Sequence, residues 1–441
     1  MKKFLLSFSL IFAGYTLNAQ SWTSQATGFD NISRGLSEIH IVNPTTVWGL
    51  AYDGVSATNV IQEFTKTIDG GITWTPGTIN VGDPTLTINN IAPISATTAW
   101  VSALTPTIGN NGVIYKTTNG GATWQQQNIG TFNAATSFIN GVHFFDANNG
   151  VSFGDAVAGE FEIYTTADGG ETWDPVPGAN IPNPLGSGAT IEYGYNGGNV
   201  AIGNTIWLVT NKGRILKSSD MGLTWTASQA PVTDFAGTAQ SARLTMSSLT
   251  NGCLLKTAGT TYTFYTTTDG GATWSAGTPF TGTYRVLAYV PGTSILVATS
   301  AATPSGSAYS TNNGTTWTTI DSGAQRGTVT FLNGSTGWCA GFNEDPFTGG
   351  VFKFTGTLSN DDFNTTKFKV YPNPASSLVN LQTEGLDSYT LKVTDLSGKV
   401  MVTREFNGVE NTLDISSYAS GVYFFEINSG NKSETIKIIK N

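Results

Sequence analysis

The stretch Thr67-Ile68-Asp69-Gly70-Gly71-Ile72-Thr73-Trp74 (TIDGGITW) decides the fold of this chain, because its pattern returns at regular distances. The pattern is Ser/Thr-x-Asp/Asn-x-Gly-x-Thr-Trp. Its six copies span residues 67–74, 117–124, 166–173, 218–225, 267–274 and 310–317. The intervals between their tryptophans are 50, 49, 52, 49 and 43 residues. A period of roughly 40–50 residues is typical of propeller blades built from four strands each.

Each copy is typical of a tight turn between two strands. The Asp or Asn side chain hydrogen-bonds to the backbone of its own turn, and Gly supplies the positive φ that the turn needs. The Asp or Asn positions are Asp69, Asn119, Asp168, Asp220, Asp269 and Asn312. Thr and Trp then begin the outer strand, so the role expected of the repeat is structural.

The repeat resembles the Asp-box, or BNR repeat, of sialidase-like propellers. In that family the box is structural and lies away from the active face. Two further stretches, residues 144–153 (FFDANNGVSF) and 331–341 (FLNGSTGWCAG), resemble the repeat of the photosystem-assembly-factor type. The resemblance implies an all-β propeller and is weak as an indication of function.

Trp22 indicates how the ring of blades closes. It lies in Ser21-Trp22-Thr23, which is similar to the end of a box without its turn, and residues 326–354 have three strand signals but no box. We therefore expect the strand at Trp22 to be the outer strand of the last blade. Six boxed blades and one closed in this way give seven, with about 48 residues per blade over residues 20–357. Six blades with a separate N-terminal strand is the alternative.

The two ends of the chain differ from the repeats between them. Residues 1–19 combine Lys2 and Lys3 with a short apolar stretch and a small final residue, as signal peptides do. We expect no transmembrane segment, because that stretch is shorter than the roughly 20 residues a span needs. Residues 358–366 (LSNDDFNTT) are polar and predict a linker. The short alternating runs of residues 367–441 predict a small Ig-like β-sandwich.

Several short motifs follow one another in this last region. They are YPNP at residues 371–374, DLSGK at 395–399, LDIS at 413–416, GVY at 421–423 and KIIK at 437–440. Together they resemble the C-terminal sorting domain of type IX secretion cargo. The resemblance implies the type IX secretion machinery as a partner and export across both membranes. It also implies removal of this domain, after which the protein is secreted or attached to the outer cell surface.

Charge and composition exclude several classes of function. Residues 20–366 contain 11 basic and 22 acidic residues, and the whole chain has a net charge of −9. Nucleic acid is not an expected partner, because phosphate binding needs clustered Lys and Arg. The sequence shows no zinc spacing and no Gly-rich phosphate loop, so neither a metal nor a cofactor is predicted. His40 and His143 occupy equivalent inner-strand positions and are interpreted as packing residues.

Arginine placement suggests a ligand site. Four of the five Arg between residues 20 and 366 lie at or near the start of a predicted innermost strand: Arg34, Arg243, Arg285 and Arg326. They belong to blades 1, 5, 6 and 7, which are contiguous around a closed ring. Guanidinium groups converging at the channel mouth would bind a carboxylate or sulfate through paired hydrogen bonds. The structural alternative is that these arginines pair with acids of neighbouring loops and hold the blades together.

These features favour an exported, non-catalytic binding module for an anionic glycan or a surface protein. The alternative is a secreted glycan-degrading enzyme, sialidase-like or active on polysaccharides. The sialidase resemblance would place Arg34, Arg243 and Arg285 on a substrate carboxylate, but no Arg-Ile-Pro motif occurs at Arg34. Hydrolases need two carboxylates across the bond. The candidates by loop position are Asp53, Asp155 and Glu160.

Overall fold

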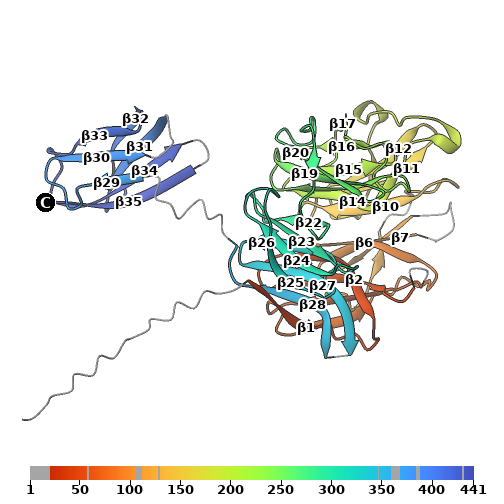
Figure 1. Cartoon of the computed structure of the whole chain (residues 1–441). Coiled ribbons are helices and arrows are strands. Elements are labelled where there is room, and N and C mark those ends of the chain that lie inside the picture. Colours follow the sequence, from red (N-terminus) through yellow and green to blue (C-terminus); the bar gives the residue numbers. More distant parts are fainter. Residues whose placement is uncertain are drawn as a thin grey trace, which may run out of the picture. The chain divides into compact units, whose positions relative to one another are not determined.

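The computed structural model describes residues 20–56, 59–104, 112–127, 130–345, 347–358, 368–383, 388–429 and 432–441. These residues form two compact units, one ending at residue 358 and the other beginning at residue 368 (Figure 1). The predicted signal peptide and residues 359–366 of the predicted linker lie outside the described residues. Within the described residues the fold is all-β apart from two 3-10 turns, Gly178–Asn180 and Gly188–Thr190.

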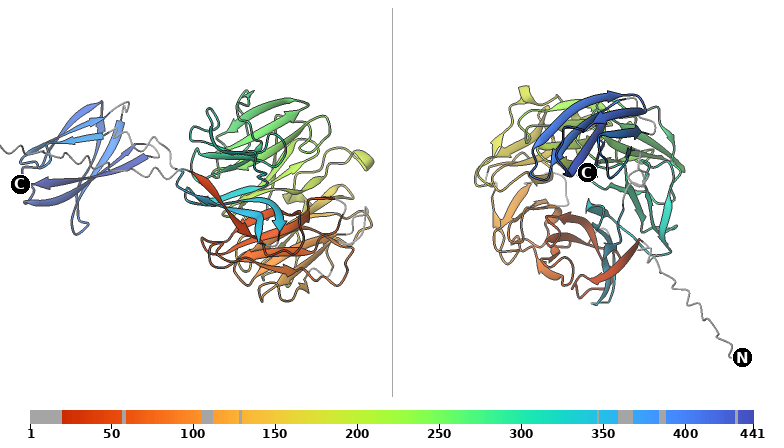
Figure 2. Two further views of the ribbon diagram at one scale, coloured as in Figure 1. Left: turned by 60° about the horizontal axis from the view of Figure 1, so that its bottom comes forward. Right: turned by 90° about the vertical axis from the view of Figure 1, so that its left-hand side faces the viewer.

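In the described part of the first unit, antiparallel strands surround a ring as five sheets of four and one sheet of eight (Figure 2). The sheet of eight consists of the first and last blades, which are joined where Gly35 pairs with Phe342, so the strands form seven blades of four. Blade 1 is β2 (Arg34–Ile41), β3 (Val47–Asp53), β4 (Glu63–Thr67) and β5 (Thr75–Thr78). Blade 2 is β6 (Thr87–Pro93), β7 (Ala99–Leu104), β8 (Val113–Thr117) and β9 (Gln125–Gln126). Blade 3 is β10 (Ile139–Phe144), β11 (Gly150–Val157), β12 (Glu160–Thr166) and β13 (Asp174–Pro175).

The remaining blades follow the same order. Blade 4 is β14 (Gly194–Ile202), β15 (Thr205–Thr210), β16 (Arg214–Ser218) and β17 (Thr226–Gln229). Blade 5 is β18 (Ser241–Met246), β19 (Gly252–Ala258), β20 (Thr261–Thr267) and β21 (Thr278–Pro279). Blade 6 is β22 (Val286–Tyr289), β23 (Leu296–Ser300), β24 (Gly306–Ser310) and β25 (Thr318–Ser322). Blade 7 is β26 (Val329–Asn333), β27 (Thr336–Asp345), β28 (Thr348–Thr355) and β1 (Ser21–Ala26).

The ring closes through β1, the first strand of the chain. β1 pairs with β28 from Ser21 opposite Thr355 to Ala26 opposite Gly350, consistent with the closure expected from Trp22. The Trp22 ring packs edge-on against Phe354, with 5.4 Å between the ring centroids. In Figure 2 the cyan strands of blade 7 accordingly lie beside the red strand β1.

The repeated pattern forms the turn between the third and fourth strands of blades 1 to 6. In the first copy the Thr67 hydroxyl donates to Asp69 Oδ1 at 2.8 Å and accepts the N–H of Gly71 at 2.8 Å. The Thr73 hydroxyl donates to Asp69 Oδ2 at 2.6 Å. Gly70 and Gly71 have φ of 73° and 89°, where a side chain would be strained. Three other copies repeat this network with Asp. In the two copies with Asn, the amide nitrogen donates to the second Thr hydroxyl instead.

Neighbouring blades are joined by a repeated pair of Trp and Lys. The buried Trp48 donates its indole N–H to Ser95 O at 2.9 Å, and Lys66 Nζ lies 4.7 Å from the Trp48 ring. Lys66 also donates to Gly120 O, in the boxed turn of the next blade, at 2.7 Å. The further pairs are Trp100 with Lys116, Trp207 with Lys217 and Trp338 with Lys353. These lysines therefore stabilise the ring rather than a ligand site.

The second unit is a sandwich of two antiparallel sheets. One sheet has the order β29 (Phe368–Tyr371), β30 (Leu378–Thr383), β33 (Glu410–Asp414). The other has the order β32 (Val400–Asn407), β31 (Ser388–Asp395), β34 (Gly421–Ser429), β35 (Lys432–Lys440). Leu381 from the first sheet and Leu391 and Phe425 from the second share one buried apolar cluster.

Candidate functional site: the central cavity

The innermost strands of six blades line a cavity of about 720 Å³. Its walls come from β2, β6, β14, β18, β22 and β26. Among the described residues that line it, the ionisable acids and bases other than Tyr289 are Glu38, His40 and Arg243. Amide side chains of Asn89, Asn90, Asn196 and Asn199 add further donors and acceptors. The cavity therefore has the size and the polar groups that a small ligand needs.

Arg243, on β18, is the cation of this cavity. Its side chain is exposed to solvent, and none of the described residues forms a hydrogen bond or an ion pair with its guanidinium group. The surrounding walls lower the pKa of Arg243, because they remove part of the hydration that stabilises its charge. An arginine remains protonated in proteins nonetheless. Arg243 is thus an uncompensated positive charge facing an open cavity.

Arg34 and Arg326 do not contribute to the cavity, so the predicted convergence of four guanidinium groups is wrong. Arg34 Nε donates to Glu63 Oε2 at 2.8 Å, and Nη1 lies 4.0 Å from Asp53 Oδ2. Arg326 Nη2 donates to Asp321 Oδ2 at 2.7 Å. The partner acids lie on β4 and β25, and both arginine side chains are buried beside them. Both arginines are therefore paired with acids: Arg34 within blade 1, and Arg326 with blade 6.

Arg285 precedes β22 and has a different environment. Its guanidinium carbon lies 3.7 Å from the centroid of the Tyr262 ring. Its buried Nε has no hydrogen-bond partner among the described residues. Stacking of this kind leaves the edge of the guanidinium group able to donate hydrogen bonds. Arg285 does not line the cavity, but β22 neighbours β18, which carries Arg243.

The three carboxylates proposed from loop position have separate surroundings. Asp53 accepts hydrogen bonds from Asn59 Nδ2 at 2.6 Å and from the N–H of Val55 at 2.8 Å, and these bonds lower its pKa. Glu160 is exposed at the first position of β12. Asp155 joins blades 3 and 4, because it accepts from Asn140 Nδ2 at 2.7 Å and from the N–H of Gly194 at 3.1 Å. None of the three lines the central cavity.

Burial gives Asp155 unusual acid–base properties. Loss of hydration raises the pKa of Asp155 to about 6, and the neighbouring Glu162 adds to this effect. Burial also raises the pKa of Glu162, whose Oε2 has no partner among the described residues. The sequence interpretation chose Glu160 and missed Glu162, although alternation along β12 places Glu162 and Glu160 on the same face.

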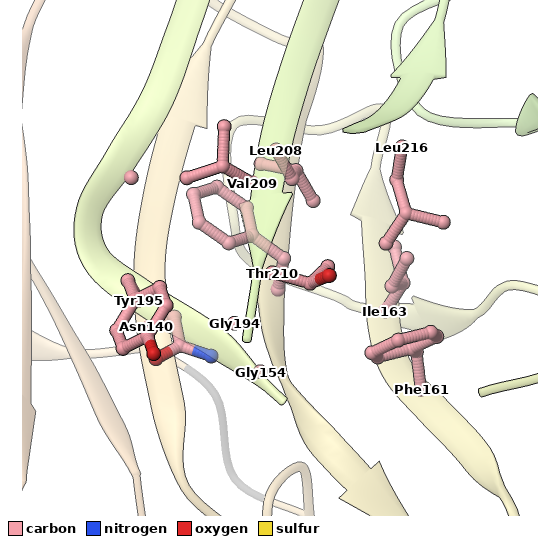
Figure 3. A pocket seen from close by; sticks show the side chains of 12 residues that line it. Asn140, Gly154, Phe161, Ile163, Gly194, Tyr195, Leu208, Val209, Thr210 and Leu216 are labelled. Atoms are coloured by element: carbon pink, nitrogen blue, oxygen red, sulfur yellow. The ribbon is translucent and has the colours of Figure 1, made fainter. Parts of the chain in front are cut away.

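The space beside Asp155 is small. A cavity between blades 3 and 4 is lined by Asn140, Gly154, Gly194 and Tyr195, among others (Figure 3). Its volume is about 10 Å³, which is close to the smallest space that holds one water molecule. A sugar ring does not fit there. Asp155 therefore acts in this structure as a hydrogen-bond acceptor between blades.

Replacing Asp155 by Asn should change how stability depends on pH. A carboxyl whose pKa is raised by folding binds its proton more tightly in the folded state, so the stability it contributes is lost as pH rises through about 6. The amide of the Asp155→Asn variant would keep an oxygen for the two donors and carry no charge. We expect the variant to exceed the unsubstituted protein by about 1–2 kcal/mol at pH 8 and to match it near pH 4.

Denaturant unfolding between pH 4 and pH 8 measures this difference. Asp53→Asn is the matched control, because the pKa of Asp53 is lowered and its loss should destabilise the protein above pH 4. Equal pH profiles for the two variants would contradict the assignment.

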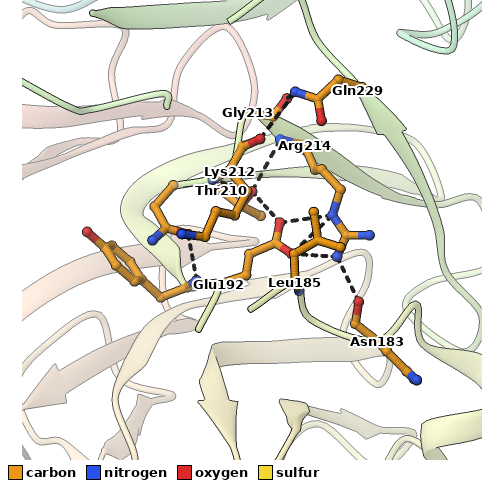
Figure 4. Close-up of polar contacts among 10 residues, drawn as sticks. Asn183, Leu185, Glu192, Thr210, Lys212, Gly213, Arg214 and Gln229 are labelled. Atoms are coloured by element: carbon orange, nitrogen blue, oxygen red, sulfur yellow. Dashed lines mark hydrogen bonds and ion pairs between the residues drawn. The ribbon is translucent and has the colours of Figure 1, made fainter. Parts of the chain in front are cut away.

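An ion pair away from the cavity joins Glu192, in the connection between blades 3 and 4, to Arg214 at the start of β16 (Figure 4). Glu192 is 0% exposed, and its Oε2 lies 2.5 Å from Arg214 Nη2. It also accepts from the Thr210 hydroxyl at 2.5 Å and from the N–H of Leu185 at 2.9 Å. Arg214 Nη2 donates to Asn183 O at 2.9 Å. These bonds fix the long connection between β13 and β14, so the role of the pair is structural.

The histidines and cysteines differ in environment, since His40 lines the cavity and both cysteines are buried. His40 Nε2 lies 2.9 Å from Glu38 Oε2, and burial, followed by the charge of His40, lowers the pKa of His143 to about 4. Cys253 and Cys339 are both buried and free. Among the described residues, no three His, Cys, Asp or Glu side chains gather as metal ligands. In the same part of the chain, no helix is long and apolar enough to cross a bilayer.

Residues 369–441 match the family described as Secretion system C-terminal sorting domain. The second unit is a type IX secretion sorting domain. The sorting domain means that the protein is exported and is either attached to the outer cell surface or secreted. No protein with a curated description matches the sequence.

The rest of the chain, ahead of the sorting domain, is similar to solved propellers. YCF48 from Cyanidioschyzon merolae has a TM-score of 0.50 and 15% identity over 76% of this chain and 98% of that one. The GH74 enzyme of Niastella koreensis has a TM-score of 0.48 and 14% identity over 95% and 74%. PorZ of Porphyromonas gingivalis, a surface component of its type IX secretion system, has a TM-score of 0.45 and 15% identity over 94% and 60%. The similarity to YCF48, at 15% identity, shows the fold alone.

Proposed function

We propose that this protein is an exported propeller that binds an anionic ligand in its central cavity without catalysis. We further propose that residues 1–19 direct export, that 20–357 form the binding ring, and that the linker 358–366 precedes the sorting domain (367–441). An acidic glycan is the favoured ligand, and an acidic group of a surface protein has the same chemistry. The observation that supports binding most directly is the unpaired Arg243 in a cavity of about 720 Å³.

The charges around Arg243 support an anion. Residues 20–366 carry twice as many acids as bases, so a free cation in the cavity is a local exception to the overall negative field. Glu38 also lines the cavity but forms no ion pair with Arg243; its Oε2 lies 2.9 Å from His40 Nε2 and accepts the N–H of Ile91 at 3.2 Å. The asparagine side chains supply amide donors and acceptors that suit sugar hydroxyls.

The alternative function is degradation of a glycan. It is supported by Asp155 and Glu162, two neighbouring carboxyl groups whose pKa values are both raised by burial. Such a shift is what a general acid needs near neutral pH. The cavity of about 10 Å³ beside Asp155 weighs against it, because no substrate fits there.

Replacing Arg243 by Ala tests the proposal. We expect more than about tenfold weaker binding of acidic glycans, because a charge-assisted hydrogen bond contributes about 1.5–3 kcal/mol. The melting temperature should hardly change, since the guanidinium group has no partner to lose. A glycan array of acidic and neutral sugars identifies the ligand, and titration calorimetry measures its affinity.

Two further variants sharpen the experiment. Arg285→Ala should weaken binding if the ligand extends from β18 to β22, whereas Lys212→Ala removes a charge outside the cavity and should have no effect. Equal binding of neutral and acidic glycans, or full binding by Arg243→Ala, would contradict the proposal. Release of shortened sugars from any bound glycan would favour the enzyme instead.

A further inference from the structure

The corner where blades 1 and 7 meet presents apolar side chains to solvent. Ile32, Val55 and Phe347 are 68%, 78% and 82% exposed. Ile32 lies before β2, Val55 after β3, and Phe347 at the turn between β27 and β28. Single exposed apolar residues are ordinary on protein surfaces, whereas a gathered group marks a place of interaction.

The three loops are held together by backbone hydrogen bonds. The N–H of Ser33 donates to Asn343 O at 2.9 Å, and the N–H of Gly54 donates to Ser33 O at 3.0 Å. These bonds join the residues next to Ile32 and Val55 to Asn343, which lies four residues before Phe347 on the same hairpin. The rings of Tyr52 and Phe342 also meet here, with centroids 5.8 Å apart. Ile32, Val55 and Phe347 therefore extend from three loops that meet at this corner.

Asn343 makes this surface rigid. Its buried side chain accepts from the Thr27 hydroxyl at 2.6 Å and donates to Phe29 O at 3.1 Å and Asn31 O at 3.4 Å. The loop that carries Ile32 is thereby fixed to β27. A surface that is already ordered loses little conformational entropy when a partner binds.

The charge of the corner is of one sign. The three loops, residues 27–33, 54–62 and 343–348, contain Asp30, Glu344 and Asp345 and neither Lys nor Arg. All three carboxylates are exposed. The nearby Arg34 is buried and paired with Glu63, so it does not offset them at the surface. A partner must therefore tolerate or match negative charge beside the apolar side chains.

We propose that Asp30, Ile32, Val55, Glu344, Asp345 and Phe347, here named the acidic corner, dock a protein segment that combines Lys or Arg with apolar side chains. Charge complementarity selects this occupant. A second copy of the acidic propeller would bring like charges together, and an anionic membrane surface would be repelled for the same reason. This surface is separate from the central cavity, whose lining contains none of the six residues.

Synthetic peptides test the proposal with the full chain. The probes are 12-residue peptides in which the number of Lys and Arg and the number of Leu and Phe vary independently, and binding is followed by fluorescence polarisation. Peptides that are both basic and apolar should bind, and their affinity should fall as salt rises. Phe347→Ser and the double variant Glu344→Gln/Asp345→Asn should each weaken binding at least tenfold. Neither change removes a buried contact.

The controls separate the corner from other surfaces. Ile72→Ser removes an apolar side chain that is 84% exposed on the boxed turn of blade 1, and it should leave binding unchanged. Arg243→Ala should also bind the peptides fully, which keeps this result independent of the cavity. Binding that ignores peptide charge or survives Phe347→Ser would overturn the proposal. Self-association, or binding to phosphatidylglycerol vesicles, that Phe347→Ser abolishes would replace it with another occupant.

Discussion

Replacing Arg214 by Ala should lower the free energy of unfolding of the propeller by about 3–5 kcal/mol, because it leaves a buried charge without a partner. Glu192 is 0% exposed, and Arg214 is the cation that faces it. The connection between β13 and β14 should lose its anchor at the same time, since Arg214 also binds Asn183 O. Denaturant unfolding measures the loss, and proteolysis within residues 176–193 reports the released connection.

Two controls show that the effect comes from burial. Glu171→Gln removes the exposed partner of Lys116, whose nitrogen lies 3.7 Å from the Glu171 oxygen, and should change stability by less than about 1 kcal/mol. The double variant Arg214→Met/Glu192→Leu removes both charges and should recover much of the loss. If Arg214→Ala is as stable as Glu171→Gln, the buried pair has been assigned too large a role.

Deleting residues 20–26 should have a still larger effect and prevent the propeller from unfolding as one cooperative unit. The deletion removes all six residue pairs between β1 and β28 and takes the Trp22 ring from the core of blade 7. It also removes Gln25, whose Oε1 accepts the indole N–H groups of Trp74 and Trp338, each at 3.1 Å. Each buried donor left without a partner costs about 1–3 kcal/mol.

Calorimetry of the truncated chain measures this loss. A synthetic peptide of residues 20–27 should restore a single transition when it is added in excess, because it can pair with β28 as β1 does. Gln25→Ala alone should give a smaller loss with cooperativity retained. An unchanged melting temperature after the deletion would show that the other blades hold the ring closed without β1.

The turns and the ring closure could be predicted from the sequence because their chemistry is local. Asp69 accepts hydrogen bonds from Thr67 and Thr73, and the Thr67 hydroxyl accepts the N–H of Gly71, so each eight-residue copy contains its own hydrogen-bond partners. The closure needed one further observation, a Trp outside any box at the start of the chain. Because the pattern recurs six times, the structure expected for one blade could be extended to the others.

The site was predicted less well, because the partner of a side chain is fixed by tertiary packing. Arg34 begins β2 and Arg243 is the third residue of β18, and both strands are innermost. Glu63 on β4 nevertheless pairs with Arg34, whereas no described residue pairs with Arg243. Strand position places the Cα of a residue but does not say which acid its side chain meets. Glu192 and Arg214 were missed for the same reason, since they lie 22 residues apart with no repeat to connect them.

The closing strand has a consequence for the order of events in synthesis and export. β1 is made first, but its partner residues 350–355 come more than 300 residues later, directly before the linker and the sorting domain. Pairing over such a separation is slow, because the loop-closure entropy must be lost before the contact forms. A chain that ends before residue 350 lacks both the partner strand of β1 and the sorting domain. The same truncation therefore prevents closure of the ring and export through the sorting domain.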